Sequence, residues 1–290
     1  MKDIIVIVGP TGVGKTKLSI ELAKSIDAEI INGDSVSIYK YLNIGSAKPT
    51  KKEMDGVVHH LIDIKELDEE YSIFDYQKDV RSLIEDITSR NKRIIIVGGS
   101  GLYLKAALYD YNLTEGTTYN EYNDLTNEQI YERIIEINED IDVHVNNRKR
   151  LVRILNKLEN NEEIGDSKDK LLYPVKIIGL TTDRDVLYDR INLRVDKMID
   201  NGLLDEINSL KDNYNNSRIL NTAIGYKEFY DYLFNDKDIK EVIESIKQNS
   251  RRYAKRQYTF FNHQMNVKWF DVNFDDFSYT INEVKKYIEK

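Results

Sequence analysis

The first chemistry visible in the sequence is a phosphate cradle close to its beginning. Residues 9–16, GPTGVGKT, fit the motif G-x-x-x-x-G-K-[ST], which is typical of nucleotide-binding and ATP-binding proteins. Glycines allow the backbone N–H groups to curl around an anion, and the N-terminus of the following helix adds partial positive charge. Lys15 supplies a mobile positive charge, and the hydroxyl of Thr16 can hold Mg²⁺. The motif therefore predicts phosphate binding, but it leaves the reaction open.

The segments around the cradle narrow the kind of phosphate chemistry. Energy-transducing NTPases carry an apolar strand that ends in an Asp near the Mg²⁺ ion. Here the apolar run 94–97 continues into GGSGLY, and the segment HHLID, ending at Asp63, has only two apolar residues before its acid. We therefore do not expect a hydrolysis-driven motor. Two interpretations remain: a small nucleoside or nucleotide kinase with a helical lid, or an enzyme that holds a diphosphate as leaving group.

A single carboxylate stands where the second expected strand ends. Asp34 follows the segment 29–32 and lies in the loop NGDSVSIYKYLNIGSAKP, residues 32–49. A side chain at this place lies beside the cradle, because ligands of parallel sheets bind beyond the carboxyl ends of the strands. One interpretation makes Asp34 a helix cap or a member of an Mg²⁺ shell. The other makes it a functional carboxylate directed at a nucleophile.

Alternating strand and helix patterns indicate the fold class. The segments with the apolar character of buried strands are residues 4–8, 29–32, 93–98, 176–180 and 267–270. The helical patterns that separate them lie at residues 17–25, 75–90, 102–108, 185–200 and 239–257. This order predicts an α/β fold, a P-loop NTPase-like parallel sheet with helices on both faces.

One segment breaks this alternation. Residues 113–170 contain no strand-like run, their ends are polar, and residues 127–138 and 148–158 have helical patterns. We expect a small helical insertion there, with a mobile lid as one possible role. The P-loop catalytic core would then consist of residues 1–112 and 171–290.

Composition restricts the class of protein further. The absence of cysteine excludes disulfides, thiol catalysis and a Cys-ligated zinc site. The first strand is expected at Ile4, which leaves no room for a signal peptide, and no apolar run has the length of a membrane span. We therefore expect a soluble, cytoplasmic protein.

The net charge of −8 argues against polyanion binding overall, but residues 146–153 and 247–256 contain basic residues and no acidic ones. These islands are either electropositive patches or solvated helix faces.

Further motifs follow one another in order along nearly the whole chain. They are GPTGVGKT, DSVSIYKYLNIGSAKP, HHLID, YSIFDYQKD, VGGSGLYLKA, HVNNRKRLVRIL, DRINLRVDKMIDNGLLDEI, AIGYKEF and RRYAKRQYTFF. Together they resemble the motifs of the bacterial tRNA dimethylallyltransferase (tRNA isopentenyltransferase) family. The positions that depart from the family pattern are Ser37 for Gln, Ser46 and Ser100 for Thr, Val145 for Pro, Asn147 for Asp and Phe260 for Trp. The insertion also lacks the basic helix that many members carry.

The resemblance implies a prenyl transfer to RNA. A member of this family transfers a dimethylallyl group from dimethylallyl diphosphate to the exocyclic amine of the adenosine 3′ of the anticodon in tRNA, and releases diphosphate. It implies Asp34 as general base, with Thr11, Lys15 and Arg194 as further catalytic residues that orient the reactants and stabilise the leaving group. Mg²⁺ is the implied cofactor, with Thr16 as its protein ligand. The residues expected around the diphosphate are Gly9, Pro10, Thr11, Gly12, Val13, Gly14, Lys15 and Thr16.

The implied partners are dimethylallyl diphosphate and the tRNA anticodon stem-loop, whose target base must leave its stack to reach a buried channel. The residues expected to contact tRNA are Asp34, Ser35, Val36, Ser37, Ser100, Lys149, Arg150, Arg153, Ala223, Ile224, Gly225, Tyr226, Lys227 and Glu228. Arg252, Lys255 and Arg256 share one helical face, which meets either the RNA or the sheet edge. Without the resemblance, a surface ion pair with an acid of its own helix is the simpler interpretation of Arg194.

Two alternatives stay open at this point. A nucleoside or nucleotide kinase would turn over nucleoside triphosphates. A non-catalytic RNA-binding module is the second alternative, and in it neither Asp34 nor the phosphate cradle would have a function. His59 and His60 have no metal-ligand spacing to the other two histidines, so we expect them to be structural.

Overall fold

The computed structural model describes residues 2–111, 113, 120–160 and 170–289. Two compact units are present: Met1–Tyr109 with Leu171–Lys290 form the larger one, and Asp110–Lys170 form the smaller one. The smaller unit thus begins at Asp110, slightly before the expected boundary at residue 113. Residues 114–119 and 161–169, which belong to the expected polar ends of the insertion, lie outside the described residues.

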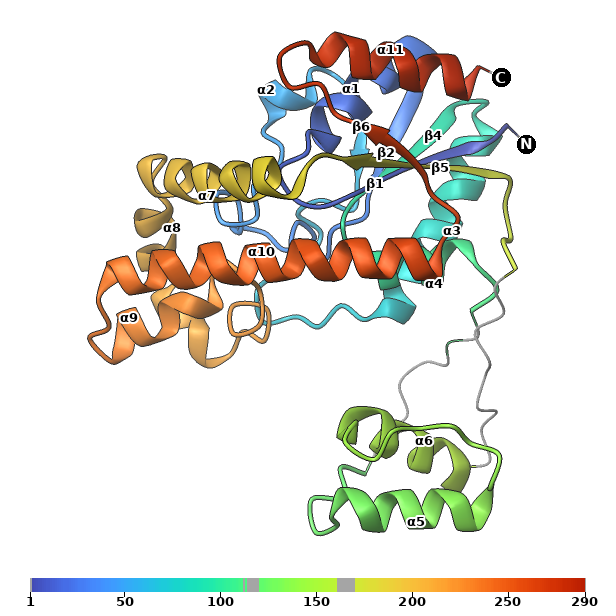
Figure 1. The fold of residues 1–290 in the computed structure, drawn as a ribbon, viewed down its shortest axis with the longest axis vertical. Helices are drawn as coiled ribbons and strands as arrows, with labels where there is room; N and C mark the ends of the chain where they lie inside the picture. Colours follow the sequence, from blue (N-terminus) through green and yellow to red (C-terminus); the bar gives the residue numbers. More distant parts are fainter. Residues whose placement is uncertain (1, 112, 114–119, 161–169, 290) are drawn as a thin grey trace. The chain divides into compact units, whose positions relative to one another are not determined.

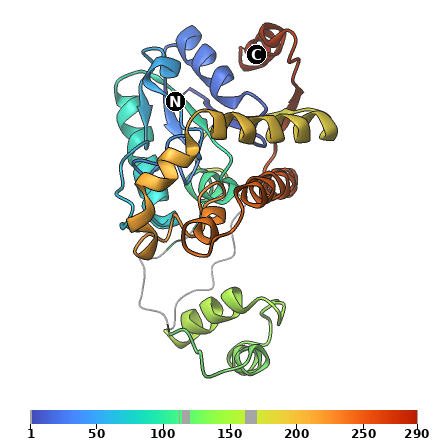
Figure 2. The same cartoon turned by 90° about the vertical axis from the view of Figure 1, so that its left-hand side faces the viewer.

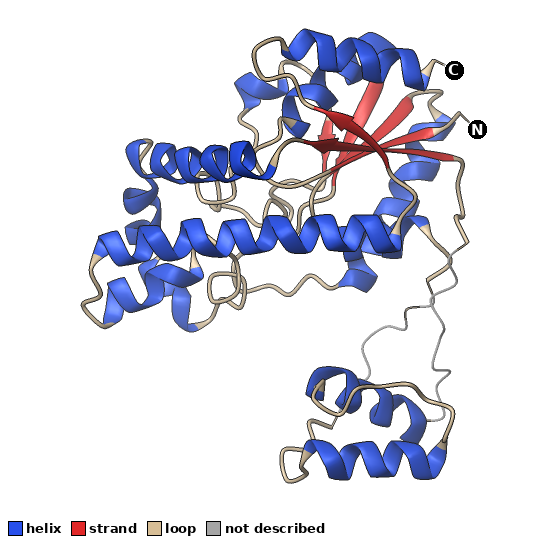
Figure 3. Ribbon diagram, in the orientation of Figure 1, coloured by secondary structure: helices blue, strands red, loops and turns tan. Residues whose placement is uncertain are grey.

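The larger unit is built on one six-stranded sheet (Figures 1 and 3). All neighbouring strands run parallel, in the order β3-β2-β4-β1-β5-β6. The strands are β1 (Ile4–Val8), β2 (Ala28–Asn32), β3 (His59–His60), β4 (Arg93–Val97), β5 (Val175–Thr181) and β6 (Lys268–Asp271). The predicted parallel α/β sheet is confirmed, and the predicted strands lie within one or two residues of the observed ones.

Helices cover both faces of this sheet. They are α1 (Lys15–Ile26), α2 (Lys51–Met54), α3 (Ile73–Ser89), α4 (Gly101–Leu108), α7 (Arg184–Asp200), α8 (Leu203–Ser209), α9 (Tyr230–Phe234), α10 (Ile239–Gln264) and α11 (Phe277–Ile288). Figures 1 and 2 show α1 and α11 on one face and α3, α4 and α10 on the other. The sheet is therefore buried on both sides, which explains its continuous apolar strands.

Two cores result, one on each face, because successive side chains of a strand point to opposite sides. Val6 and Ile96 belong to the core beneath α3 and α4. Ile5 and Ile95 belong to the core beneath α1 and α11. All four side chains are fully buried. This packing holds the carboxyl ends of β1, β2 and β4 side by side, where a ligand site is expected.

Two elements differ from the sequence prediction. Strand β3 was missed, because it consists of two histidines whose strand state depends on pairing with β2. The ring of His60 bonds to the Glu29 carboxylate at 2.7 Å, consistent with a structural role. Helix α10 continues past the predicted end at Gln257 to Gln264, because the wholly buried Phe261 extends its apolar stripe.

Two glycines allow the loop after β2 and the turn after β4 to come into direct backbone contact. A Cβ placed on Gly98 would lie 2.1 Å from the carbonyl carbon of Gly33, so the two backbones cross in direct contact. Ser100 N–H donates to the Gly33 carbonyl at 3.1 Å. Gly33 and Gly98 follow β2 and β4 directly, and this contact therefore brings Asp34 next to Gly99.

The smaller unit is a helical pair with its own core. It contains α5 (Asn127–Ile137) and α6 (Arg148–Glu159), close to the predicted ranges. Its buried apolar residues are Tyr122, Ile130, Ile134, Val143, Leu151, Ile154 and Leu155. The guanidinium of Arg148 bonds to the carbonyls of Tyr122 and Leu125, and so fixes the segment before α5.

Candidate active site

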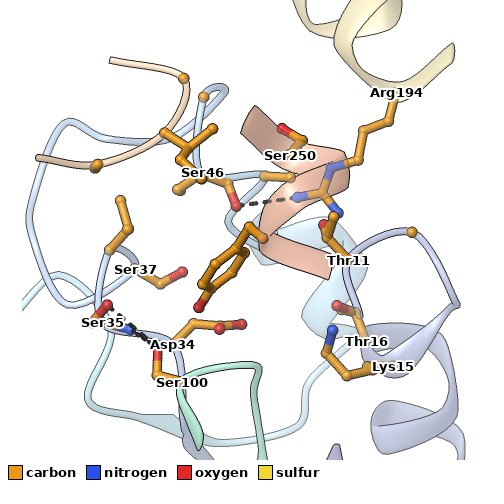
Figure 4. Close-up of a pocket in the computed structure, with 18 of the residues that line it drawn as sticks. Thr11, Lys15, Thr16, Asp34, Ser35, Ser37, Ser46, Ser100, Arg194 and Ser250 are labelled. Carbon is orange, nitrogen blue, oxygen red and sulfur yellow. Dashed lines mark hydrogen bonds between the residues drawn. The ribbon is translucent and has the colours of Figure 1, made fainter. Parts of the chain in front are cut away.

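A cavity of about 540 Å³ lies at the carboxyl ends of the strands in the larger unit. Its walls come from the cradle, the loop after β2, the turn after β4, helices α7 and α10, residues 222–225 and Lys227. Figure 4 shows Lys15, Asp34 and Arg194 around this one space. The structure therefore brings together side chains that the sequence places far apart.

The cradle leads from β1 into α1, with a Gly14 φ of 93°, the left-handed conformation that glycine adopts without strain. The cradle residues that line the cavity are Thr11, Gly12, Gly14, Lys15 and Thr16. Gly9 and Pro10 do not line it; their carbonyls accept bonds from Lys15 Nζ at 2.9 and 2.8 Å. The side chain of Val13 is wholly buried in the core, so only its backbone is available to an anion.

The ammonium group of Lys15 is held ready inside the cradle. Burial lowers its pKa to about 8; the charge of Asp34 opposes this shift, and the charge of Arg194 adds to it. A bound diphosphate would add negative charge close to the ammonium group and would raise its pKa again. Anion binding and protonation of Lys15 are therefore coupled.

We expect the affinity for pyrophosphate to fall as the pH rises above about 8. The free protein then loses the Lys15 proton, the complex keeps it, and binding must take up a proton, which costs up to about tenfold in affinity per pH unit. Calorimetric titrations in buffers of different ionisation enthalpy measure affinity and proton uptake together. Lys15→Met, measured in parallel, corrects for the titration of pyrophosphate itself. A wild-type pH profile identical to that of Lys15→Met would contradict the prediction.

Arg194 approaches the cavity from α7. Its Nη2 donates to the Ser46 carbonyl at 3.4 Å (Figure 4). Burial lowers its pKa, and the nearby charge of Asp34 opposes that shift. Asp196 pairs instead with Lys247, at 2.7 Å. Asp196 therefore does not form the surface ion pair with Arg194 that the sequence suggested. The side chain of Arg194 lines the cavity instead.

Asp34 is held by its neighbours in a defined position. The side chain of Asn32 accepts from the Asp34 N–H at 3.1 Å and donates to its carbonyl at 2.9 Å. Gly99 N–H donates to Asp34 Oδ1 at 2.7 Å. The next helix along the chain, α2, is capped by Thr50 and not by Asp34. Of the interpretations left open by the sequence, a metal shell and a functional carboxylate remain.

The serines of the loop and turn complete this side of the cavity. Ser35, Val36, Ser37 and Ser100 all line it. Their contact with RNA stays a prediction. Ser35 N–H donates to Ser100 Oγ at 3.0 Å, which joins the loop after β2 to the turn after β4. His59, expected to be only structural, also lines the cavity.

The AIGYKE segment lines the cavity only in part. Ala223, Ile224, Gly225 and Lys227 are in the wall. Tyr226 is a correction: its side chain is wholly buried and donates to Glu206, so it cannot contact RNA.

Glu228 does not line the cavity, and its contact with tRNA stays a prediction. Its side chain is partly exposed, and its carboxylate accepts from Gly225 N–H and from Asn249 Nδ2, both at 2.8 Å. Its bonds therefore stabilise the turn behind the wall.

Helix α10 contributes residues that the sequence analysis did not assign to the site. Ser250, Tyr253 and Gln257 line the cavity at helical spacing. Two of them, Tyr253 and Gln257, belong to the motif RRYAKRQ, for which the sequence analysis considered only the basic residues. Arg252, Lys255 and Arg256 are exposed, and of these Arg256 lines the cavity.

The basic residues predicted in the smaller unit lie on α6. Lys149, Arg150 and Arg153 are exposed, whereas Leu151 and Leu155 of the same helix are buried. No salt bridge is formed by these three cations with other described residues of the chain. They form a basic face that is available to a polyanion.

The donor set at the cradle suits a cation that binds through its substrate. Within the described ranges, no three His, Cys, Asp or Glu side chains cluster as a metal site. Thr16 is exposed to the cavity and offers a single hydroxyl. Mg²⁺ commonly binds through one or two protein ligands, with phosphate oxygens and water as the others. The residues present therefore fit an Mg²⁺ ion brought by a diphosphate.

None of the helices described is long and apolar enough to span a membrane.

Comparison with known proteins places these features in a family. Residues 37–264 match the family model described as IPP transferase. A tRNA dimethylallyltransferase from Anoxybacillus flavithermus is 45% identical over 300 residues, which cover 99% of this chain and 96% of the relative. The full-length tRNA isopentenylpyrophosphate transferase from Bacillus halodurans superposes with a TM-score of 0.75 at 40% identity, covering 100% of this chain and 97% of that one. A eukaryotic dimethylallyltransferase acting on tRNA gives a TM-score of 0.81 at 29% identity, over 93% of this chain and 74% of that one. The motifs, the fold and these matches agree, and the chain belongs to the tRNA dimethylallyltransferase (IPP transferase) family.

Proposed function

We propose that the protein transfers a dimethylallyl group from dimethylallyl diphosphate to the exocyclic amine of the adenosine 3′ of the anticodon in tRNA, and releases diphosphate. Family membership supports transfer to tRNA. One structural observation carries the reaction type: a phosphate cradle and the carboxylate of Asp34 line one cavity, while β4 continues into Gly98 where an NTPase would carry an Asp. A cradle opposite a base suits displacement of a diphosphate by a nucleophile.

Asp34 acts as the general base in this proposal. The exocyclic amine of adenosine is a weak nucleophile, because its lone pair is delocalised into the ring. The amine nitrogen attacks C1 of the dimethylallyl group, the C1–O bond breaks, and the bonding electrons leave with the diphosphate. The amine proton passes to Asp34. Positioned proton transfer of this kind contributes typically ~10²–10⁴-fold in rate.

The cradle stabilises the leaving group. Negative charge builds up on the diphosphate as the C1–O bond breaks, and Lys15, Arg194 and the N–H groups of the cradle are already in place around it. Thr11 lines the same space and orients the reacting ends. Mg²⁺, held by Thr16 and the phosphate oxygens, would supply additional charge neutralisation when bound. After the transfer, the positively charged side chains of Lys15 and Arg194 still bind the released diphosphate.

The acceptor is an unpaired base that has left its stack. RNA sequence is read mainly on unstacked loop bases, and an enzyme that modifies a base must take it into a pocket. Ser35, Ser37 and Ser100 offer hydrogen-bonding groups along the cavity wall. The exposed cations of α6 are proposed to contact the backbone of the anticodon stem-loop.

One experiment separates this function from its alternatives. The protein is incubated with unmodified tRNA and radiolabelled dimethylallyl diphosphate, and in parallel with radiolabelled ATP and a panel of nucleosides. Label in the RNA from the diphosphate alone supports the proposal. Phosphoryl transfer from ATP to a nucleoside or nucleotide would favour the kinase, and binding of tRNA without any label transfer would favour a non-catalytic RNA-binding protein.

The basic face of α6 leads to a prediction about salt. Replacing Arg150 and Arg153 with Ala should weaken tRNA binding and reduce the slope of log K against log salt by roughly 0.7–0.9 for each phosphate contact removed. The stability should change by no more than about 0.5 kcal/mol, because both side chains are exposed. Filter binding over a range of salt concentrations measures the slope.

Arg133 supplies the matched control for that measurement. It is an exposed arginine on α5 of the same unit, so Arg133→Ala removes the same charge from a different helix. An equal loss of slope in the control would assign the effect to net charge, and would leave the α6 cations as a solvated face.

A further inference from the structure

Helix α10 reaches the carboxylate of Asp34 through a single residue, Gly99. The Gly99 N–H donates to Asp34 Oδ1 at 2.7 Å. The carbonyl of Gly99 accepts from Gln257 Nε2 at 3.1 Å and from the Tyr253 hydroxyl at 3.3 Å. One glycine therefore binds the carboxylate with its N–H and α10 with its carbonyl.

The contact is close enough to require glycine. A Cβ built on Gly99 would lie 2.1 Å from Gln257 Nε2 and 3.2 Å from Asp34 Oδ1. The side chains of Gln257 and Asp34 thus press against the same backbone unit. A shift of α10 towards Gly99 would press on the peptide whose N–H binds the carboxylate.

The amide of Gln257 adopts an orientation that has a cost. The Gly99 carbonyl can only accept, so the amide must direct its NH₂ group to it. The amide oxygen Oε1 is then buried with no hydrogen-bond partner among the described residues. An unpaired buried acceptor is unfavourable, and an apolar side chain would fill the same space without this cost. Unfavourable local features of this kind are concentrated at functional sites, where they contribute to the mechanism.

Tyr253 supports the same carbonyl with a permanent donor. Burial and the nearby charge of Asp34 together raise the pKa of its hydroxyl to about 12. The hydroxyl therefore stays protonated at any working pH and keeps its bond to Gly99. The Asp34 carboxylate receives one bond from this arrangement, at Oδ1, and no partner of Oδ2 occurs among the described residues.

We propose that Gln257 and Tyr253 are positioning residues, which hold the Gly99 peptide so that its N–H binds one oxygen of Asp34 and leaves the other oxygen directed at the acceptor amine. The inference rests on the proposed role of Asp34 as the general base. Both side chains act through Gly99 on the orientation of the base, so they matter for the proton transfer and not for the affinity of either substrate. Displacements of about 1 Å at a reacting group can cost ~100-fold in rate.

The test uses Gln257→Leu and Tyr253→Phe in the full chain. Single-turnover transfer at saturating tRNA and dimethylallyl diphosphate should fall ~10- to 100-fold in each variant. The dissociation constants of both substrates should stay within about twofold. The melting temperature of Gln257→Leu should not fall, because leucine removes the unpaired Oε1 and Tyr253 still donates to Gly99. Tyr253→Phe keeps the ring and carries the test by itself if Gln257→Leu does not fold.

Gln77 provides the matched control. It is also a buried glutamine, and its Nε2 donates to a backbone carbonyl, that of Ala106, at 2.8 Å. Gln77→Leu should lower the melting temperature and leave the transfer rate per folded molecule unchanged. The opposite pattern in the two glutamine variants, with stability lost at Gln257 and rate lost at Gln77, would overturn the inference.

A double-mutant cycle with Asp34→Asn separates this inference from the proposed function. If Gln257 acts through Asp34, Gln257→Leu adds no further loss in the Asp34→Asn background. An equal loss in both backgrounds, or a wild-type rate for Gln257→Leu beside a strongly impaired Asp34→Asn, would overturn only the positioning role. A near-wild-type rate for Asp34→Asn would overturn the proposed base and the inference together.

Discussion

Asp34→Asn is expected to lower the rate of dimethylallyl transfer by ~10²–10⁴, which corresponds to roughly 3–5 kcal/mol of barrier, and to leave substrate binding almost unchanged. Asparagine has nearly the same shape as aspartate and keeps an oxygen that can accept from Gly99 N–H. It cannot take a proton at neutral pH. The geometry around residue 34 is therefore retained, and only the base is lost.

Single-turnover transfer at saturating substrates, repeated across Mg²⁺ concentration, tests this result. If Asp34 belonged to a metal shell, the loss would appear as weaker diphosphate binding, and additional Mg²⁺ would partly restore the rate. If Asp34 only shaped the loop, Asn would be within a few-fold of wild type. Either outcome would remove Asp34 from the proton transfer and with it the central step of the proposed reaction.

Arg194→Gln is expected to lower the transfer rate by ~10²–10³, because a preorganised cation is most effective where charge develops in the transition state. The side chain of Arg194 lines the cavity beside the cradle, and among the described residues its only observed hydrogen-bond partner is a backbone carbonyl, that of Ser46. Arg194→Lys should restore little, since an ammonium group cannot reproduce the planar fork of donors. Single-turnover rates together with pyrophosphate affinity measure both effects.

Asp196→Asn is the control for Arg194. It removes a carboxylate from the same helix, one that pairs with Lys247 and not with Arg194. We expect it to change stability by no more than about 1 kcal/mol and to leave the transfer rate unchanged. A loss in Asp196→Asn as large as that in Arg194→Gln would indicate that the arginine acts through an ion pair on α7.

Local patterns were sufficient for much of the fold and for the cradle. The apolar runs of β1 and β4 and the amphipathic stripe of α3 depend on residues within a few positions of one another, and their limits were predicted closely. The motif at residues 9–16 predicted an anion site for the same reason. Strand β3 was not predictable, because its two residues become a strand only by pairing with β2.

The sequence by itself determined the parallel sheet, the cradle with Lys15 and the presence of a carboxylate at Asp34, because each depends on residue type and short-range spacing. Only the tertiary structure decided which of the candidate residues meet. Asp34 and Gly99 are 65 positions apart and Gln257 is 158 positions from Gly99, yet they form one hydrogen-bonded chain. The same packing buried Tyr226 in the core and made it a support of the wall. Contacts of this kind follow from how strands and helices stack on both faces of the sheet, and no local pattern records them.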